Sequence, residues 1–276
     1  MHVHAISTGA VRVTTRQRRG SGSGALRPLL TLTDRHYTEP LPIWTWAIEH
    51  PEGVIVVDTG ETARVMEPGW FPRWHPYFRT AVKFDIRPEQ EVGPQLRERG
   101  IEPGDVSKVV LTHMHSDHAG GLSHFPDSEI LLSRAELELA SGTRGKLRGF
   151  LPQHWPSWFD PTLVEPCPEP VGPFAESLPL TAAGDVRIVP TPGHTPGHLS
   201  VVLDEGERLV FLAGDTSYDQ GLMVEGAIDG VSSDPRAAVA TMDRIRTLAA
   251  ERPLVYLPTH DPDAGRRLDA REPVSP

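Results

Sequence analysis

Residues Lys108–Leu122 read KVVLTHMHSDHAGGL and place four side chains that can bind a metal ion within six positions. The apolar run Val109–Leu111 predicts a short strand, beyond which His113 and His115 leave on the same side. Asp117 and His118 then fall in the turn that follows. Because two imidazoles aim at one point and a carboxylate and an imidazole aim at a neighbouring one, the pattern favours a metal site over isolated structural histidines.

Three further candidate ligands, His194, Asp215 and His260, each follow a short apolar run that predicts a strand. Open α/β sheets place their ligands at such strand ends. With them the set holds five histidines and two aspartates, too many for one tetrahedral zinc ion. The set suits two ions that share one carboxylate. Mixed imidazole and carboxylate ligands favour zinc, iron, cobalt or manganese over calcium or magnesium.

The rest of the sequence alternates predicted strands with predicted helices, which indicates an α/β class with helices covering sheet faces. Helices are expected over Pro88–Arg99, Ser133–Ala140 and Asp234–Glu251, the last with Asp234 as its N-cap. The predicted strands are Ile43–Ile48, Val54–Val57, Val109–Leu111, Glu129–Leu132, Val186–Val189, Ser200–Leu203, Leu209–Leu212 and Leu254–Leu257.

Length and composition narrow the class of protein. The 276 residues suit a single domain over 1–276, with long, aromatic-rich loop insertions around 61–86 and 141–178. A net charge of −10 argues against nucleic-acid or membrane partners. The single cysteine, Cys167, excludes an internal disulfide and a multi-cysteine zinc site. With neither a long apolar run nor a signal-peptide pattern, a cytoplasmic location is expected.

The pattern His-x-His-x-Asp-His, followed by His194, Asp215 and His260, resembles the metallo-β-lactamase superfamily. This resemblance implies an αββα sandwich, with two central sheets and helices on the outer faces. It also implies two divalent metal ions per chain, with zinc favoured, and with Asp215 and a hydroxide bridging them. Asp58, in VVDTG, matches a position that supports a metal-binding histidine. By the same resemblance the first ion is bound by His113, His115 and His194, and the second by Asp117, His118 and His260.

Tyr218, in GDTSY, resembles the N-acyl-homoserine lactonase branch of that superfamily. The resemblance implies that the bridging hydroxide attacks the lactone carbonyl and opens the ring, a quorum-quenching activity. Tyr218 would then polarise the carbonyl, and Asp117 or Asp215 would carry the proton to the leaving oxygen. The implied partner is a small lactone or ester, and a homodimer is left open.

Other activities on the same scaffold stay open at this point. They are a thioesterase of the glyoxalase II type, a general lactonase or esterase, and a phosphodiesterase. A further alternative is a persulfide dioxygenase that uses one iron ion, which would leave Tyr218 without a role. Metal content distinguishes that alternative, because one iron ion per chain favours it and two metal ions favour hydrolysis.

Overall fold

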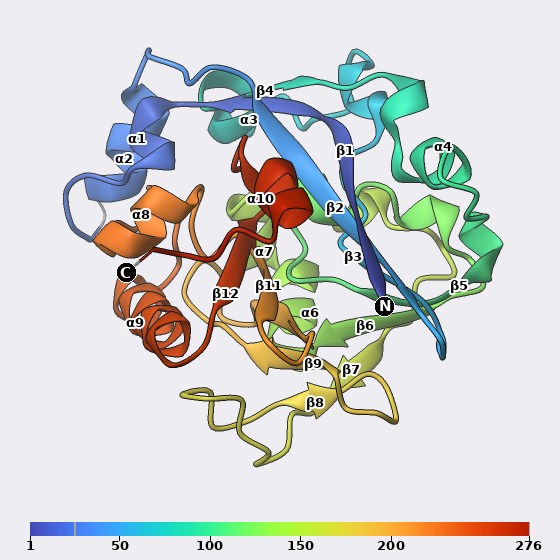
Figure 1. Ribbon diagram of the computed structural model, residues 1–276. Helices are drawn as coiled ribbons and strands as arrows, with labels where there is room; N and C mark the ends of the chain where they lie inside the picture. The colour runs from blue at the N-terminus through green and yellow to red at the C-terminus, as the bar shows by residue number, and fades with distance from the viewer. Residues whose placement is uncertain (25, 276) are drawn as a thin grey trace.

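The computed structural model describes residues 1–24 and 26–275, which form two mixed β-sheets packed face to face (Figure 1). The larger sheet has seven strands in the order β4-β1-β2-β3-β5-β6-β7. Its strands are β1 (His2–Val13), β2 (Leu41–His50), β3 (Gly53–Val57), β4 (Val82–Asp85), β5 (Val106–Val110), β6 (Glu129–Ser133) and β7 (Thr162–Val164).

The smaller sheet has five strands in the order β12-β11-β10-β9-β8. Alternate residues of its strands point to opposite faces, as the pleat requires. Val201 and Leu212 pack in the core between the sheets, whereas Val202 and Phe211 pack on the outer side. The strands are β8 (Leu178–Pro179), β9 (Val186–Pro190), β10 (Leu199–Asp204), β11 (Leu209–Gly214) and β12 (Leu254–Pro258).

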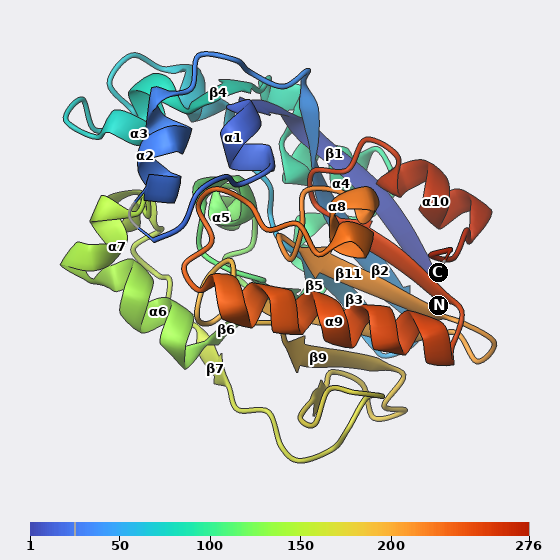
Figure 2. The same cartoon turned by 90° about the vertical axis from the view of Figure 1, so that its left-hand side faces the viewer.

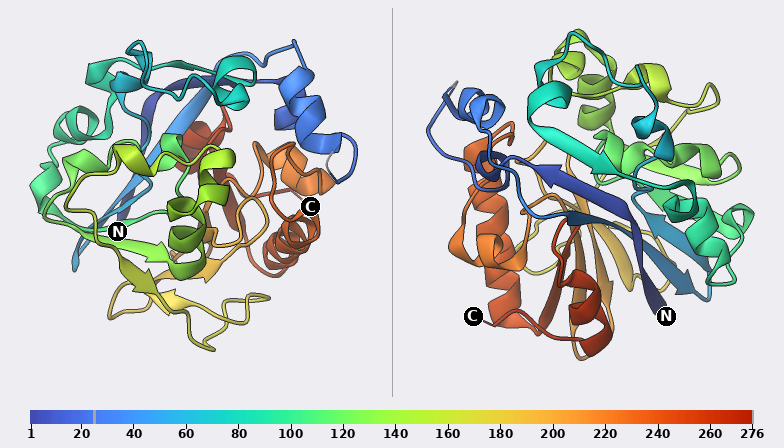
Figure 3. Two further views of the ribbon diagram at one scale, coloured as in Figure 1. Left: turned by 180° about the vertical axis from the view of Figure 1, so that it is seen from behind. Right: turned by 90° about the horizontal axis from the view of Figure 1, so that it is seen from above.

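Helices cover the outer face of each sheet, which confirms the expected αββα arrangement. Seen from above, α9 lies on one side of the two sheets and the green and cyan helices lie on the other (Figures 2 and 3). The longer helices are α2 (Leu26–Thr33), α4 (Val92–Arg97), α6 (Arg134–Ser141), α8 (Gln220–Glu225), α9 (Pro235–Glu251) and α10 (Ala264–Ala270). The shorter ones are α1 (Thr15–Arg18), α3 (Pro76–Thr80), α5 (Ser116–Ala119) and α7 (Thr143–Leu147).

Each outer face has its own apolar core. Leu96 of α4 packs with Val109 of the larger sheet, and Ile245 of α9 packs with Phe211 of the smaller one. These two layers and the core between the sheets account for most of the buried apolar side chains. Within residues 1–24 and 26–275, every helix is too short or too polar to cross a membrane.

Two sequence-based expectations need correction. The helix predicted over Pro88–Arg99 is divided into a 3-10 turn, Pro88–Gln90, and α4, because Glu91 between them is extended. The Glu91 carboxylate accepts the backbone N–H of Ala63 (2.8 Å) and lies 2.8 Å from Nε2 of His124, contacts that no local pattern encodes. The apolar pattern also did not indicate β1, which pairs with β2 and β4.

Strand direction brings the carboxyl ends of five strands to one edge. β5 runs parallel to β3, and β12 runs parallel to β11. β9 points the same way as β11, because both are antiparallel to β10. The segments that leave β3, β5, β9, β11 and β12 carry Asp58, the His113–His118 cluster, His194, Asp215 and His260, respectively.

The N-cap of α9 offers a test of helix energetics. Asp234 accepts the N–H groups of Arg236 (2.9 Å) and Ala237 (3.1 Å), as the sequence predicted. Asp234→Ala leaves these donors unpaired, and we expect it to lower the free energy of unfolding by about 1 kcal/mol in urea denaturation. Thr247→Ala, on the exposed face of the same helix, is the control. Equal stability of the two variants would contradict a capping role for Asp234.

Candidate metal centre

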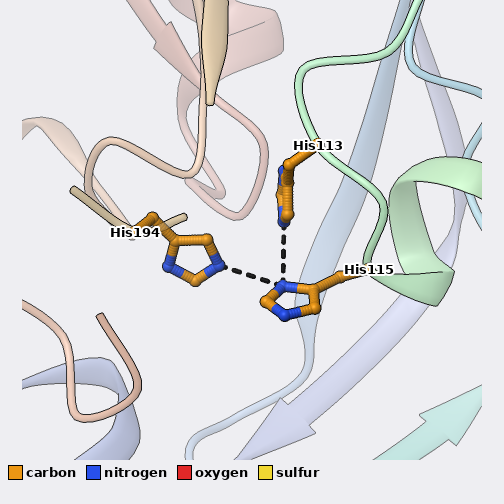
Figure 4. Close-up of side chains that lie close together, drawn as sticks. All are labelled: His113, His115 and His194. Atoms are coloured by element: carbon orange, nitrogen blue, oxygen red, sulfur yellow. Dashed lines mark hydrogen bonds between the residues drawn. The ribbon is translucent and has the colours of Figure 1, made fainter. Parts of the chain in front are cut away.

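The imidazole rings of His113, His115 and His194 lie together just beyond the carboxyl ends of β5 and β9 (Figure 4). Nδ1 of His115 lies 2.9 Å from Nε2 of His113 and 3.1 Å from Nε2 of His194. A ring nitrogen carries either one N–H or one lone pair. Nδ1 of His115 can therefore form a hydrogen bond with only one of these two neighbouring nitrogens when no metal ion is bound. Ligands at two vertices of a tetrahedral zinc site lie about 3.3 Å apart, close to these separations.

Asp215 lies between this group and a second one. Its Oδ2 is 3.6 Å from Nε2 of His194 and 3.5 Å from Nε2 of His260, and its Oδ1 is 3.3 Å from Nε2 of His118. Asp117 completes the second group, with Oδ2 3.5 Å from Nε2 of His260. The structure therefore brings together all seven candidate ligands, with one carboxylate facing both groups.

Four of the histidines are oriented by a bond from their other ring nitrogen. Nδ1 of His118 donates to Asp58 (2.8 Å), and Nδ1 of His194 donates to Asp229 (3.0 Å). Nδ1 of His260 donates to the carbonyl of Pro42 (3.0 Å). These acceptors carry no proton, so each ring keeps a lone pair on Nε2, the nitrogen that faces the cluster.

Thr112 orients the fourth ring, His113. Its hydroxyl donates to Oδ2 of Asp58 (2.9 Å) and so is free to accept Nδ1–H of His113 (3.0 Å). Asp58 also accepts the backbone N–H of Thr112 (2.8 Å). One carboxylate thus fixes two rings of the cluster, His118 directly and His113 through Thr112.

Asp58 adopts the left-handed conformation, with φ of 59°. Few residues other than glycine tolerate this region, and aspartate and asparagine are among them. The turn aims the carboxylate under the His113–His118 segment, and the next residue, Thr59, donates its backbone N–H to the carbonyl of His118 (2.7 Å). The strained turn and the ligand segment therefore hold each other in place.

Two residues of the centre were not predicted as site residues. Asp229 orients His194 and also accepts the backbone N–H of Val231 (2.7 Å). His198 lies beneath the cluster, where its Nε2 accepts the backbone N–H of Asp215 (3.0 Å). Burial lowers the pKa of His198 to about 3, so it stays a neutral acceptor. His198 ends the run PTPGHTPGH that also carries His194, a local signal that could have pointed to it, whereas no such run surrounds Asp229.

Buried polar atoms of the cluster that lack hydrogen-bond partners indicate that the seven side chains fit metal ions. Nε2 of His118 and Oδ1 of Asp215 are buried and have no hydrogen-bond partner among the described residues. Leaving such groups unpaired is costly, and a cation between them would satisfy both. Burial lowers the pKa of His113 and His115 well below the usual value, which keeps both rings neutral. Against the effect of burial, neighbouring carboxylates raise the pKa of His118, His194 and His260, so a metal ion would displace a proton from each of these rings. We propose that these seven side chains bind the metal ions.

Tyr218 lies beside the second group. Its ring stacks on that of His260, with centroids 5.3 Å apart and planes at 25°. The hydroxyl oxygen accepts Nε2–H of Gln17 (2.8 Å). The side chain is therefore fixed at both its ring and its hydroxyl, next to Asp215 and His260.

Aromatic residues of the two long segments pack around the centre. The ring of Phe150 lies against that of His115, with centroids 4.7 Å apart. Trp70, from segment 61–86, stacks on His154, from segment 141–178, with centroids 3.8 Å apart. The contact between Trp70 and His154 joins the two segments, and the contact of Phe150 places the second segment against the cluster.

Glu61 is a fully buried acid beside the ligand segment. One carboxyl oxygen accepts the backbone N–H of Thr62 (2.9 Å), and the other has no hydrogen-bond partner within the described chain. Burial raises the pKa of Glu61 to about 8. The side chain therefore favours the protonated form in the folded chain at neutral pH.

The layers and the clustered ligands define a metallohydrolase fold with a candidate centre for divalent metal ions. The profile of the metallo-beta-lactamase superfamily matches residues 38–260, and the chain belongs to that superfamily.

Individual relatives agree with this assignment. A "probable metallo-hydrolase" of Mycobacterium tuberculosis is 33% identical over 64% of this chain, a stretch that spans 57% of the relative. The N-acyl homoserine lactonase of Bacillus thuringiensis is 28% identical over 78% of this chain and 80% of its own. A solved N-acyl homoserine lactone hydrolase, with its product N-hexanoyl-L-homoserine at the catalytic metal centre, superposes with a TM-score of 0.75. It is 21% identical and covers 96% of this chain and 94% of its own.

Asp58→Asn tests the support of the ligand rings. Asparagine tolerates the left-handed turn but has only one acceptor oxygen. It therefore loses either the bond from the Thr112 backbone N–H or the two bonds from the Thr112 hydroxyl and Nδ1–H of His118. We expect metal affinity to fall by about ten- to hundredfold, measured by competition with a chelator and elemental analysis. Asp127→Asn, at an exposed turn, is the matched control. Unchanged affinity in Asp58→Asn would show that this carboxylate does not support the centre.

The raised pKa of Glu61 predicts a pH-dependent stability. Above the unfolded value near 4.5 the unfolded chain loses this proton, whereas the folded chain keeps it up to about pH 8. This group therefore lowers the free energy of unfolding as pH rises from 4.5 to 8. With chelator present throughout, Glu61→Gln should gain stability relative to wild type across that window.

The exposed Glu98→Gln variant provides the control for that comparison and should show no such trend. A constant difference between Glu61→Gln and wild type at every pH would contradict the assignment.

Proposed function

We propose that this chain is a metal-dependent hydrolase that opens the lactone ring of N-acyl homoserine lactones. The observation that carries the proposal is the position of Asp215 between two groups of ligands, with the Tyr218 hydroxyl beside them. Five histidines and two aspartates suit a pair of ions, for which zinc is the favoured identity. The lactonase relatives support the choice of substrate, and the product of the reaction would be an N-acyl homoserine.

The residues of the cluster would have different roles in ring opening. His113, His115 and His194 would hold one ion, Asp117, His118 and His260 the other, and Asp215 both. When bound, such ions supply Lewis-acid polarisation and a water of lowered pKa. Tyr218 would donate its hydroxyl proton to the substrate carbonyl oxygen as negative charge develops there.

Proton transfer to the leaving oxygen falls to Asp117 in this proposal. Among the two aspartates of the cluster, its side chain is the more exposed, at 17% against 7% for Asp215. Ring opening breaks the bond between the acyl carbon and the ring oxygen, adds water across it, and leaves a carboxylate and a hydroxyl group. The hydroxyl group needs one proton, which Asp117 would accept from the attacking water and pass to the leaving oxygen.

A substrate panel with and without chelator tests the activity. It holds N-acyl homoserine lactones of several chain lengths, a simple lactone, an aryl ester, a thioester, a phosphodiester and a β-lactam. We expect chelator-sensitive turnover of the acyl homoserine lactones, with two metal ions per chain. Turnover of the thioester alone would replace the lactonase with a thioesterase, and one iron ion per chain would favour the dioxygenase alternative.

Tyr218→Phe tests the role of the hydroxyl. Loss of one donor aimed at a developing oxyanion lowers kcat by about a hundredfold in well-studied hydrolases. We expect a large fall in kcat with metal content unchanged, measured by steady-state kinetics and elemental analysis. Unchanged kinetics would remove Tyr218 from the reaction.

A further inference from the structure

Gln17, in the short helix α1, forms hydrogen bonds with Tyr77 and Tyr218, two tyrosines that are distant in sequence. Its side-chain nitrogen Nε2 lies 2.8 Å from the hydroxyl of Tyr218 and 2.9 Å from that of Tyr77. Gln17 itself is only 2% exposed. Since an amide nitrogen carries two N–H groups, each can be donated to one phenol oxygen. The two hydroxyls are therefore less than about 6 Å apart.

The orientation of the Gln17 amide follows from its surroundings. Oε1 is buried and has no hydrogen-bond partner in the described part of the chain. Exchanging the oxygen and nitrogen would put two N–H donors in that place, and two unpaired donors cost more than one unpaired acceptor. With the nitrogen facing the tyrosines, both phenol oxygens accept, and both keep their own O–H to donate to another group.

Both hydroxyls are available as donors. Each phenol oxygen accepts an N–H from Gln17, and a phenol is protonated at neutral pH because its ordinary pKa is about 10. Tyr77 comes from the aromatic segment 61–86 and Tyr218 from the segment that follows β11, so only the folded chain pairs them.

An N-acyl homoserine lactone presents two acceptors at a comparable spacing, the lactone carbonyl and the amide carbonyl on the adjoining substituent. We propose that Tyr77 is a second substrate-binding phenol, which donates to the amide carbonyl while Tyr218 donates to the lactone carbonyl. Gln17 acts as the positioning residue that sets the distance between them. This inference rests on the proposed function and adds a basis for recognising acylamino lactones over plain lactones.

The test compares two lactones, N-hexanoyl homoserine lactone and α-heptyl-γ-butyrolactone, which has a similar chain but no amide carbonyl. Tyr77→Phe should lower kcat/KM for the first by about three- to tenfold, mainly through KM, and leave the second within about twofold. Tyr218→Phe should lower kcat for both. Tyr37→Phe is the control for a displaced α3, because its hydroxyl donates to the carbonyl of Thr80 at the end of that helix, and it should leave the ratio of kcat/KM between the two lactones unchanged.

Gln17→Met removes both donors in a side chain of similar length. It should lower kcat/KM for both lactones, with the larger loss for the amide-bearing one, at unchanged metal content. If Tyr77→Phe does not fold, kcat/KM of Gln17→Met on the two lactones provides the same comparison. Equal losses on the two lactones, or no loss, in these variants would overturn the inference alone. Failure of the wild-type enzyme to open N-hexanoyl homoserine lactone would overturn the proposed function and the inference together.

Discussion

The centre depends on keeping bare imidazole nitrogens inside a buried cluster. Four rings achieve this by donating Nδ1–H outward, to Asp58, Asp229, Thr112 and a backbone carbonyl. Without those acceptors the rings could rotate or exchange tautomers, and the nitrogens would no longer converge. The groups behind the ligands are therefore as important to the centre as the ligands themselves.

The sandwich supplies a common edge for residues that lie far apart in the chain. Strands of both sheets end there, and their connecting segments carry the candidate ligands from position 113 to position 260, with Asp58 behind them. The two sheets are held together by a continuous apolar core, which makes the strand ends a rigid frame. Short segments on a rigid frame can hold side chains within the narrow limits that metal binding requires.

The residues proposed to contact the substrate come from less regular parts of the fold. Gln17 lies in the short helix α1, and Tyr77 in α3, within the first aromatic segment. Stacking of Trp70 on His154 joins this segment to the second one. In the proposed function, the residues that would bind the ions and those that would select a substrate thus come from different parts of the chain, which would allow specificity to change while the centre stays constant.

The sequence by itself predicted the layered fold and the cap of α9, which the structure confirms, and it supplied the proposed ligand set with Asp58 behind it. These features follow from local sequence patterns. A histidine or aspartate follows an apolar run, and Asp-Pro precedes apolar residues at helical spacing. Only the tertiary structure decided the roles of Asp229, His198 and Gln17 and the division of the helix at Glu91. Their partners lie from 17 to more than 200 residues away, and a hydrogen bond across that distance leaves no periodic trace in the chain.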